Sequence, residues 1–268
     1  MKYVKTFESY LLEDSIEILK MRDVVPLSRI NKRAANASIG RGGNDGDRKD
    51  DVVGGKKASI AVKNLQAAQT EIIAEKAIGM AIGTMLNAKP TKIGGDLGSI
   101  VSEDNFIMDG HHRWAATFLC DPNAKVEATQ IDLPGKSLVT ALNTITVGMF
   151  NRGGNSGDGN IKDFTGKNIG ALLDNFLENG IQGKFPITPE QVKESLGNMP
   201  GANGDFEKGK ALMMKNADSL PKKIMPGAPP RVEMPVIGPD EVAKVKQMLA
   251  NGEIDLTNPY SDEVNKEL

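Results

Sequence analysis

One short segment constrains the fold of this chain more than any other, because it passes from strand signals to helix signals within a few residues. Residues 98–120 read GSIVSEDNFIMDGHHRWAATFLC. The apolar runs on either side of the polar SEDN tetrapeptide predict a β-hairpin. Gly110 then allows the chain to turn, and the apolar spacing that follows predicts a helix. The segment therefore predicts a strand that leads directly into a helix start.

The flanking sequence extends this segment into a domain over residues 58–150. Residues 58–63 and 125–133 have the composition of strands, whereas apolar spacing predicts helices from about Thr70 to residue 87 and over 136–150. We therefore expect an α/β (α+β) fold, in which a small mixed sheet is packed by helices.

The N-terminal part of the chain is expected to lie outside this domain. Residues 1–30 predict a helix, from apolar residues at helical spacing over 3–20, and then a short strand at VVPLSRI, residues 24–30. Residues 31–57 are rich in Gly, Asn, Asp and basic residues, and their composition favours a flexible insertion.

The C-terminal part of the chain begins with a second Gly-rich segment. Residues 151–166, which start NRGGNSGDGN, predict a loop, and residues 167–268 predict a helical C-terminal region. Within this region Thr188 and Pro189 have the pattern of a helix N-cap followed by the first helical residue. The expected helices are 167–179, 188–197, 205–218 and 239–250, with the proline-rich connection PGAPPRVEMP at 226–235.

Charge and cysteine content restrict the partners of the chain. The net charge is −2 and the pI is about 5.8, so a nucleic-acid partner is possible but not favoured. A single cysteine, Cys120, excludes an intramolecular disulfide and a cysteine-based zinc cluster. There is no apolar run of membrane-spanning length and no signal-peptide pattern at the N-terminus. We expect a cytoplasmic protein with no membrane partner.

The DGHHR turn, residues 109–113, has the features of an anion site. The first N–H groups of a helix have no intrahelical partner, and the helix dipole favours negative charge there. Gly110 lets a phosphate approach the backbone, and Arg113 can fork onto phosphate oxygens. His111 and His112 are the only histidines in the chain, and we expect their imidazoles to add hydrogen-bond donors.

A metal site built from the protein alone is a weaker interpretation of the same turn. Asp109 and the two histidines are ligand types, but adjacent residues rarely converge on one ion. A Mg²⁺ ion held jointly by Asp109 and nucleotide phosphates fits better. Trp114 and Cys120 follow on the same helix and are expected to be core residues.

The DGHHRWAA motif, with a hairpin before it and a strand after it, resembles the ParB/sulfiredoxin superfamily over about residues 60–150. In that superfamily a related turn opens a helix and binds nucleotide phosphates. The LQAAQTE segment, residues 65–71, occupies the place of an upstream family element. The resemblance implies a ParB/sulfiredoxin-like nucleotide-binding domain with ATP or CTP as the nucleotide.

The branches of the superfamily imply different activities. Sulfiredoxins carry a reactive cysteine where this chain has His111, which excludes their repair chemistry. ParB partition proteins carry a helix-turn-helix DNA-binding domain, and the sequence of residues 161–268 shows no convincing pattern for one. Free serine kinases share the D-G-H-H-R turn, but Gln69 appears where they have a catalytic glutamate, with Glu71 two residues further on. Some relatives are described as nucleases. The opening KTFESYL and the Gly-rich insertions also resemble ParB-like proteins of large phages.

Three functional hypotheses follow. In the first, the chain is an NTPase or phosphotransferase with catalytic Glu71, Asp109 and His111. Its nucleotide would be bound by Gln69 and by residues 110–113, with Mg²⁺ on Asp109. In the second, nucleotide binding switches a protein partner at the helical C-terminal region without turnover. In the third, Asp109 and a histidine form a metal-dependent nuclease. A scaffold without chemistry remains as the structural alternative.

Overall fold

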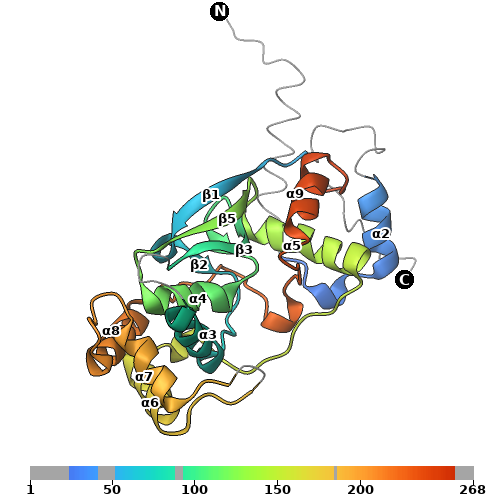
Figure 1. Ribbon diagram of the computed structural model, residues 1–268. Helices are drawn as coiled ribbons and strands as arrows, with labels where there is room; N and C mark the ends of the chain where they lie inside the picture. The colour runs from blue at the N-terminus through green and yellow to red at the C-terminus, as the bar shows by residue number, and fades with distance from the viewer. Residues whose placement is uncertain (1–23, 42–51, 88–92, 184–185, 257–268) are drawn as a thin grey trace, which may run out of the picture.

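A five-stranded mixed sheet lies between two groups of helices (Figure 1). The computed structural model describes residues 24–41, 52–87, 93–183 and 186–256. The strand order is β1-β5-β3-β4-β2, with β1 antiparallel to β5, β5 parallel to β3, β3 antiparallel to β4, and β4 parallel to β2. The mixed α/β class is therefore confirmed. The strands are β1 Gly55–Ala61, β2 Gln66–Ala67, β3 Gly95–Ser102, β4 Phe106–Ile107 and β5 Lys125–Ile131.

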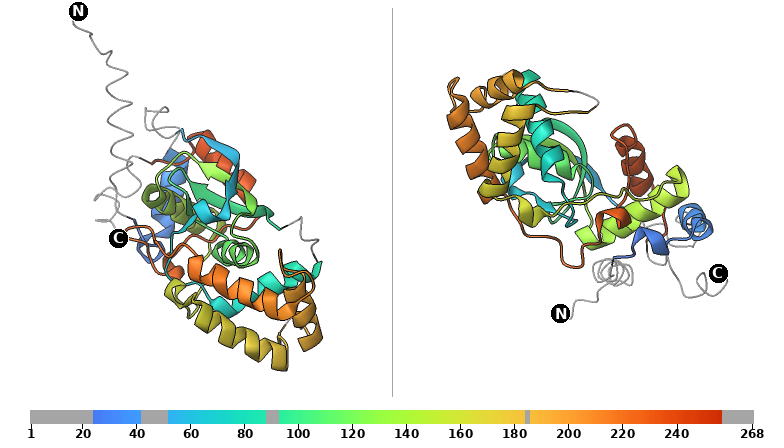
Figure 2. Two further views of the ribbon diagram at one scale, coloured as in Figure 1. Left: turned by 90° about the vertical axis from the view of Figure 1, so that its left-hand side faces the viewer. Right: turned by 90° about the horizontal axis from the view of Figure 1, so that it is seen from below.

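Each face of the sheet is covered by its own apolar core (Figures 1 and 2). The helices α3 (Ala74–Asn87) and α4 (His111–Cys120) pack on one face, and α5 (Gly135–Ile145) and α9 (Val242–Ala250) on the other. Successive strand residues point to opposite faces, so Val101 packs in the first core and its neighbour Ile100 in the second. This alternation is why the short apolar runs of the hairpin serve both cores.

The predicted C-terminal helices are confirmed. They are α6 (Gly166–Asn179), α7 (Pro189–Gly197), α8 (Phe206–Ser219) and α9. The first three form a bundle against α3 and α4. Thr188 and Gln191 close the start of α7 with a reciprocal capping box, and Pro189 is its first residue. None of the helices in the described ranges has the length and apolar character needed to cross a membrane.

Two N-terminal predictions differ from the structure. Residues 24–30 do not form a strand; they contain the 3₁₀ helix η1, Leu27–Arg29, because the N–H groups of this segment bond within a local turn or to side chains. The Val25 N–H donates to Thr140 Oγ1, and the Ser28 N–H to the Glu233 carboxylate. The prediction of a strand here is wrong.

Part of the range expected to be a flexible insertion, residues 31–57, is helical. The helix α2, Lys32–Arg41, buries Ala34 and Ala35. It packs against α5 and against the π-helix Thr146–Phe150, which continues from the C-terminus of α5. Gly148 permits this close approach, because a Cβ there would lie 3.3 Å from the Ala35 Cβ. The buried face of α2 is thus formed by small residues, and a search for large apolar residues at helical spacing does not detect such a helix. The predicted helix at 3–20 lies outside the described residues.

Candidate functional site

A cleft of about 280 Å³ opens at the start of α4. Three segments far apart in the sequence meet there: the strand-to-helix turn, the Gly-rich loop and residues 231–239, which we call the strap. The strap is irregular apart from the 3₁₀ helix η6, Arg231–Glu233. The lining residues are Gln69, Lys76, Met80, Met108, Asp109, Gly110, His111, His112, Arg113, Asn155, Arg231, Met234, Pro235, Val236 and Pro239.

Gly110 shapes the wall formed by α4. Its φ of 93° lies in the left-handed region, and a Cβ at this position would collide with Ser99 Oγ. The first intrahelical bond of α4 is from the Trp114 N–H to the Gly110 carbonyl, and no side chain caps the helix. The N–H groups of the first turn therefore have no helical acceptor, as an anion site requires.

The two histidines hold the segment that precedes α3. The Ala68 N–H donates to His111 Nε2 at 3.1 Å, and the Ile73 N–H donates to His112 Nε2 at 3.0 Å. Adjacent imidazoles thus diverge and bind both ends of residues 68–73. The sequence prediction treated both rings as donors, but each Nε2 is an acceptor and only Nδ1 carries a proton in these tautomers.

Burial keeps both imidazoles neutral. Desolvation, with a smaller contribution from the neighbouring His112, lowers the pKa of His111 to about 3. Desolvation and the nearby Lys76 lower the pKa of His112 to about 4. The positive charge of Arg231 acts on both rings in the same direction. The imidazoles therefore bring no positive charge to the cleft near neutral pH.

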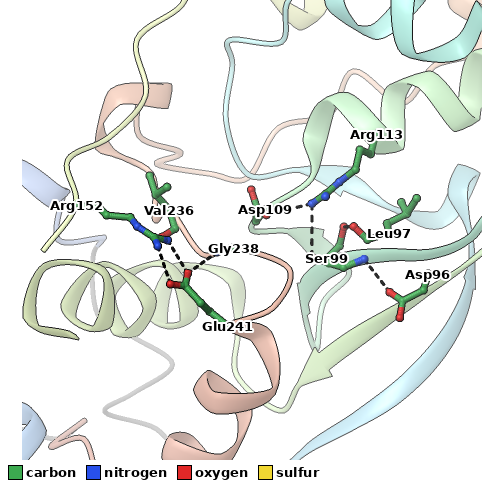
Figure 3. Close-up of polar contacts among 10 residues, drawn as sticks. Asp96, Leu97, Ser99, Asp109, Arg113, Arg152, Val236, Gly238 and Glu241 are labelled. Atoms are coloured by element: carbon green, nitrogen blue, oxygen red, sulfur yellow. Dashed lines mark hydrogen bonds and ion pairs between the residues drawn. The ribbon is translucent and has the colours of Figure 1, made fainter. Parts of the chain in front are cut away.

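Arg113 and Asp109 form an ion pair one helical turn apart (Figure 3). Arg113 Nη2 lies 3.2 Å from Asp109 Oδ2, and both side chains are about one-third exposed. Burial raises the pKa of Asp109, although the Arg113 charge opposes this shift. Among the described residues that line the cleft, Asp109 alone has a carboxylate. A Mg²⁺ ion here would thus need oxygens from phosphate or water as well.

Gln69 and Glu71 lie close together but play different parts. Gln69 is buried, lines the cleft, and donates from Nε2 to the Glu71 carbonyl at 2.7 Å. The Glu71 carboxylate accepts bonds from the Thr70 hydroxyl at 2.7 Å and from the Arg231 N–H at 2.9 Å. Glu71 is not among the lining residues, and its carboxylate fastens the strap to the segment preceding α3.

The site also contains cations that sequence reasoning missed. Lys76 reaches it from α3 and Arg231 from the strap. Arg231 Nη1 donates to the Ser156 carbonyl of the Gly-rich loop at 2.7 Å. Lys76 was within reach of prediction, because it lies in the first turn of α3, the helix that packs against α4. Arg231 was not, because no local pattern brings a proline-rich connection to α4.

The Gly-rich loop has a structural explanation for its glycines. A Cβ at Gly154 would collide with the Val232 carbonyl, one at Gly157 with the Arg231 guanidinium, and one at Gly159 would lie 2.9 Å from the Ile72 carbonyl. The loop thus packs closely against the strap and the segment preceding α3. Its glycines permit that packing, and Asn155 is the loop residue that lines the cleft.

Two further predictions concern residues that follow the turn on α4. Trp114 is fully buried and its Nε1–H donates to the Val62 carbonyl at 2.9 Å, so it is a core residue, as predicted. Cys120 is buried as well, and burial raises the pKa of its thiol to about 12, which makes it unreactive. Within the described part of the chain, no group of three His, Cys, Asp or Glu side chains could hold a metal ion.

Comparison with known proteins gives no match: no family matches the sequence, and no curated protein or solved structure is significantly similar to it. The residues of the cleft are therefore the basis for any functional assignment.

Proposed function

We propose that the chain is a nucleotide-binding protein whose cleft takes the phosphates of ATP or CTP at the start of α4. The observation that carries this proposal is the combination of an uncapped helix start with Gly110 and Arg113 at its first turn, inside a cleft. Backbone N–H groups and a guanidinium are the donors that phosphate groups require. The resemblance to ParB/sulfiredoxin proteins supports the same assignment.

A nucleotide-gated switch fits the surrounding contacts better than a dedicated enzyme. Glu71, the expected catalytic base, uses its carboxylate to bind Thr70 and the strap. His111 and His112 are neutral acceptors of backbone bonds. Residues of the strap and Asn155 of the Gly-rich loop line the cleft, so a bound nucleotide would contact them and change their position relative to α4. The helical C-terminal region would pass that change to a protein partner.

The proposal is tested by ligand-induced stabilisation. Wild type, Arg113→Ala and the control Arg29→Ala are heated with ATP, CTP, GTP or ADP, with and without Mg²⁺. Arg29 is an exposed arginine on η1, so its loss controls for the removal of a charge. A nucleotide at one hundred times its Kd stabilises the folded state by about 2.7 kcal/mol. We expect that shift in wild type and Arg29→Ala and its loss in Arg113→Ala. Absence of any shift in wild type contradicts the proposal.

A second candidate function, phosphoryl transfer, is favoured by one observation. The raised pKa of Asp109 makes this carboxylate a stronger base than an ordinary aspartate, and it sits beside the proposed phosphate site. Mg²⁺ held by the phosphates and water would supply the remaining charge neutralisation and leave Asp109 free to accept the proton. Asp109→Asn should then abolish nucleotide turnover while binding persists. Turnover that survives this substitution would exclude Asp109 as the base.

A further inference from the structure

Arg231 is held in the cleft from two directions. Its backbone N–H donates to the Glu71 carboxylate at 2.9 Å, and its Nη1 donates to the Ser156 carbonyl at 2.7 Å. A guanidinium has more N–H donors than the Ser156 bond uses. The side chain is half-buried and lines the same cleft as Arg113. The strap therefore presents a fixed cation with N–H groups that remain to bind a ligand.

The cleft has cations on two walls. Lys76 and Arg113 come from α3 and α4, which pack against each other and form one wall. Arg231 comes from the strap, which forms the other wall, and its charge contributes, after desolvation, to the lowered pKa of both imidazoles on the α4 wall. Asp109 is the single carboxylate of the described lining, and it is already paired with Arg113. The positive charge of the cleft is thus in excess and lies on both sides.

We propose that Arg231 binds the far end of a polyphosphate chain, so that the cleft selects a di- or triphosphate over a single phosphate, and that Glu71 is the positioning residue that holds Arg231. This inference rests on the proposed nucleotide-binding function and deepens it. An anion with charge on successive phosphoryl groups reaches both walls at once. A single phosphate reaches one wall and leaves the cation on the other without a partner.

Substitution of Arg231 tests the role of the strap cation. Arg231→Gln removes the charge but keeps the backbone N–H, so the bond from the strap to Glu71 survives. Lys223→Gln is the matched control, because Lys223 is exposed and outside the described lining of the cleft. The probes are tripolyphosphate, pyrophosphate and inorganic phosphate, titrated calorimetrically at one ionic strength.

We expect wild type and Lys223→Gln to bind tripolyphosphate more tightly than phosphate. Loss of one charge-assisted contact should weaken tripolyphosphate binding by Arg231→Gln about tenfold or more. Inorganic phosphate reaches the α4 wall only, so the affinity of Arg231→Gln for phosphate should stay within about twofold of the wild-type affinity. A twofold change corresponds to less free energy than the loss of one hydrogen bond. The preference for the longer anion should therefore shrink in this variant alone.

Glu71 is tested by comparing two substitutions. In Glu71→Gln the amide oxygen still accepts the Arg231 N–H, so the tripolyphosphate affinity should match that of wild type. In Glu71→Ala that acceptor is lost, and the affinity should fall as it does in Arg231→Gln. The double variant Glu71→Ala/Arg231→Gln should bind no more weakly than either single variant, because both act through one side chain. A catalytic base would instead leave affinity unchanged in Glu71→Ala.

The outcomes separate this inference from the proposed function. If Arg231→Gln binds tripolyphosphate as wild type does while Arg113→Ala does not, the role of Arg231 is overturned and the phosphate site at α4 stands. If Arg231→Gln weakens phosphate and tripolyphosphate equally, the selection of a longer anion is overturned. If wild type binds none of the three anions and no nucleotide, both proposals fail together.

Discussion

The two walls of the cleft are held in place by different kinds of contact. The α4 wall follows directly from a hairpin, and its first turn is tied to residues 68–73 by two backbone-to-imidazole bonds, one buried and one partly buried. The strap wall has almost no regular structure. Side chains from distant segments bind its backbone: Glu71 binds the Arg231 N–H and Thr146 binds the Val236 N–H.

This difference indicates where the cleft can open. Breaking the α4 wall exposes buried imidazoles and disrupts the core around Trp114, which requires much of the free energy of global unfolding. Releasing the strap requires the loss of a few partly buried hydrogen bonds and of the packing of Met234 and Ile237 in the second core, but it disrupts no α-helix or strand. The α4 wall is therefore expected to stay fixed while the strap moves, which suits a rigid anion site covered by a movable segment. The predictions below test this contrast.

Acidification should have the largest effect, and it acts on the α4 wall. The folded pKa values of His111 and His112, about 3 and about 4, lie below the ordinary value of 6.5. Between pH 6.5 and about 4 the unfolded chain binds protons that the folded protein does not. Stability should thus fall as the pH falls, by up to about 1.4 kcal/mol per pH unit for each histidine.

Urea unfolding at several pH values measures this slope. The control is His111→Gln/His112→Gln, whose amide oxygens can accept the same backbone bonds without titrating. Asp109 acts in the opposite direction, because its raised pKa favours the folded state below its ordinary pKa, and this contribution is lost as the pH rises. An identical acid slope in wild type and the double variant would falsify the assignment of neutral, buried imidazoles.

The next largest effect should come from Gly110→Ala. A non-glycine residue in the left-handed region costs about 1–2 kcal/mol, and here the added Cβ also collides with Ser99. Gly204→Ala is the matched control, because Gly204 has a φ of 87° with no atom within 4 Å of the added Cβ. Thermal unfolding should show a clearly greater loss for Gly110→Ala. Equal losses in the two variants would mean that the close approach to Ser99 has no energetic consequence.

The sequence predicted the α4 wall of the cleft but not the strap wall. The α4 wall was predictable because hairpin, glycine turn and helix are adjacent in the chain and follow local rules. Arg231 was not, because its place depends on how a proline-rich connection packs against Ser156 and Glu71, which lie 75 and 160 positions away. The histidines were found at the right position, but their hydrogen-bonding role depends on burial, which no spacing rule gives.

The elements of the fold also differ in how far local sequence predicts them. Helices with strong apolar spacing and caps, such as α7, were predicted to within a residue or two. The helix α2 was missed because its buried face is made of Ala34, Ala35 and Ser38, which pack closely against α5 without a conspicuous apolar pattern. Tertiary packing outweighs local composition at such a site.

A smaller effect is expected when the strap is released from Thr146, the first residue of the π-helix that follows α5. Thr146 Oγ1 accepts the Val236 N–H at 3.2 Å, and Thr146→Val preserves shape but removes that acceptor. Because the bond is only partly buried, its loss should cost about 1 kcal/mol. Hydrogen exchange should accelerate at residues 234–237 and stay unchanged at α4. Thr117→Val is the counterpart on the α4 wall, because the Thr117 hydroxyl only adds a second bond to the Arg113 carbonyl. Exchange that accelerates equally in both segments would argue against a separately movable strap.

The smallest effect should come from the ion pair that joins the Gly-rich loop to the segment after the strap. Arg152 Nη1 and Nη2 lie 2.5 Å and 2.7 Å from the two carboxylate oxygens of Glu241, which also accepts the Gly238 N–H (Figure 3). Because the Arg152 side chain is 40 % exposed, Arg152→Ala should cost no more than about 1 kcal/mol, and less at high salt. Lys210→Ala, which removes an ion pair with Asp174 in the distant bundle, is the matched control.

Urea unfolding at two salt concentrations gives the stability, and hydrogen exchange at residues 236–241 gives the local effect. Both variants should lose a similar, salt-screened amount of stability, but only Arg152→Ala should raise exchange near the cleft. If that exchange rises as much as it does in Thr146→Val, the ion pair holds the strap as firmly as the bond from the Val236 N–H to Thr146 does. The two ends of the strap would then open together, because the pair fastens one end through Gly238 and Thr146 fastens its middle through Val236.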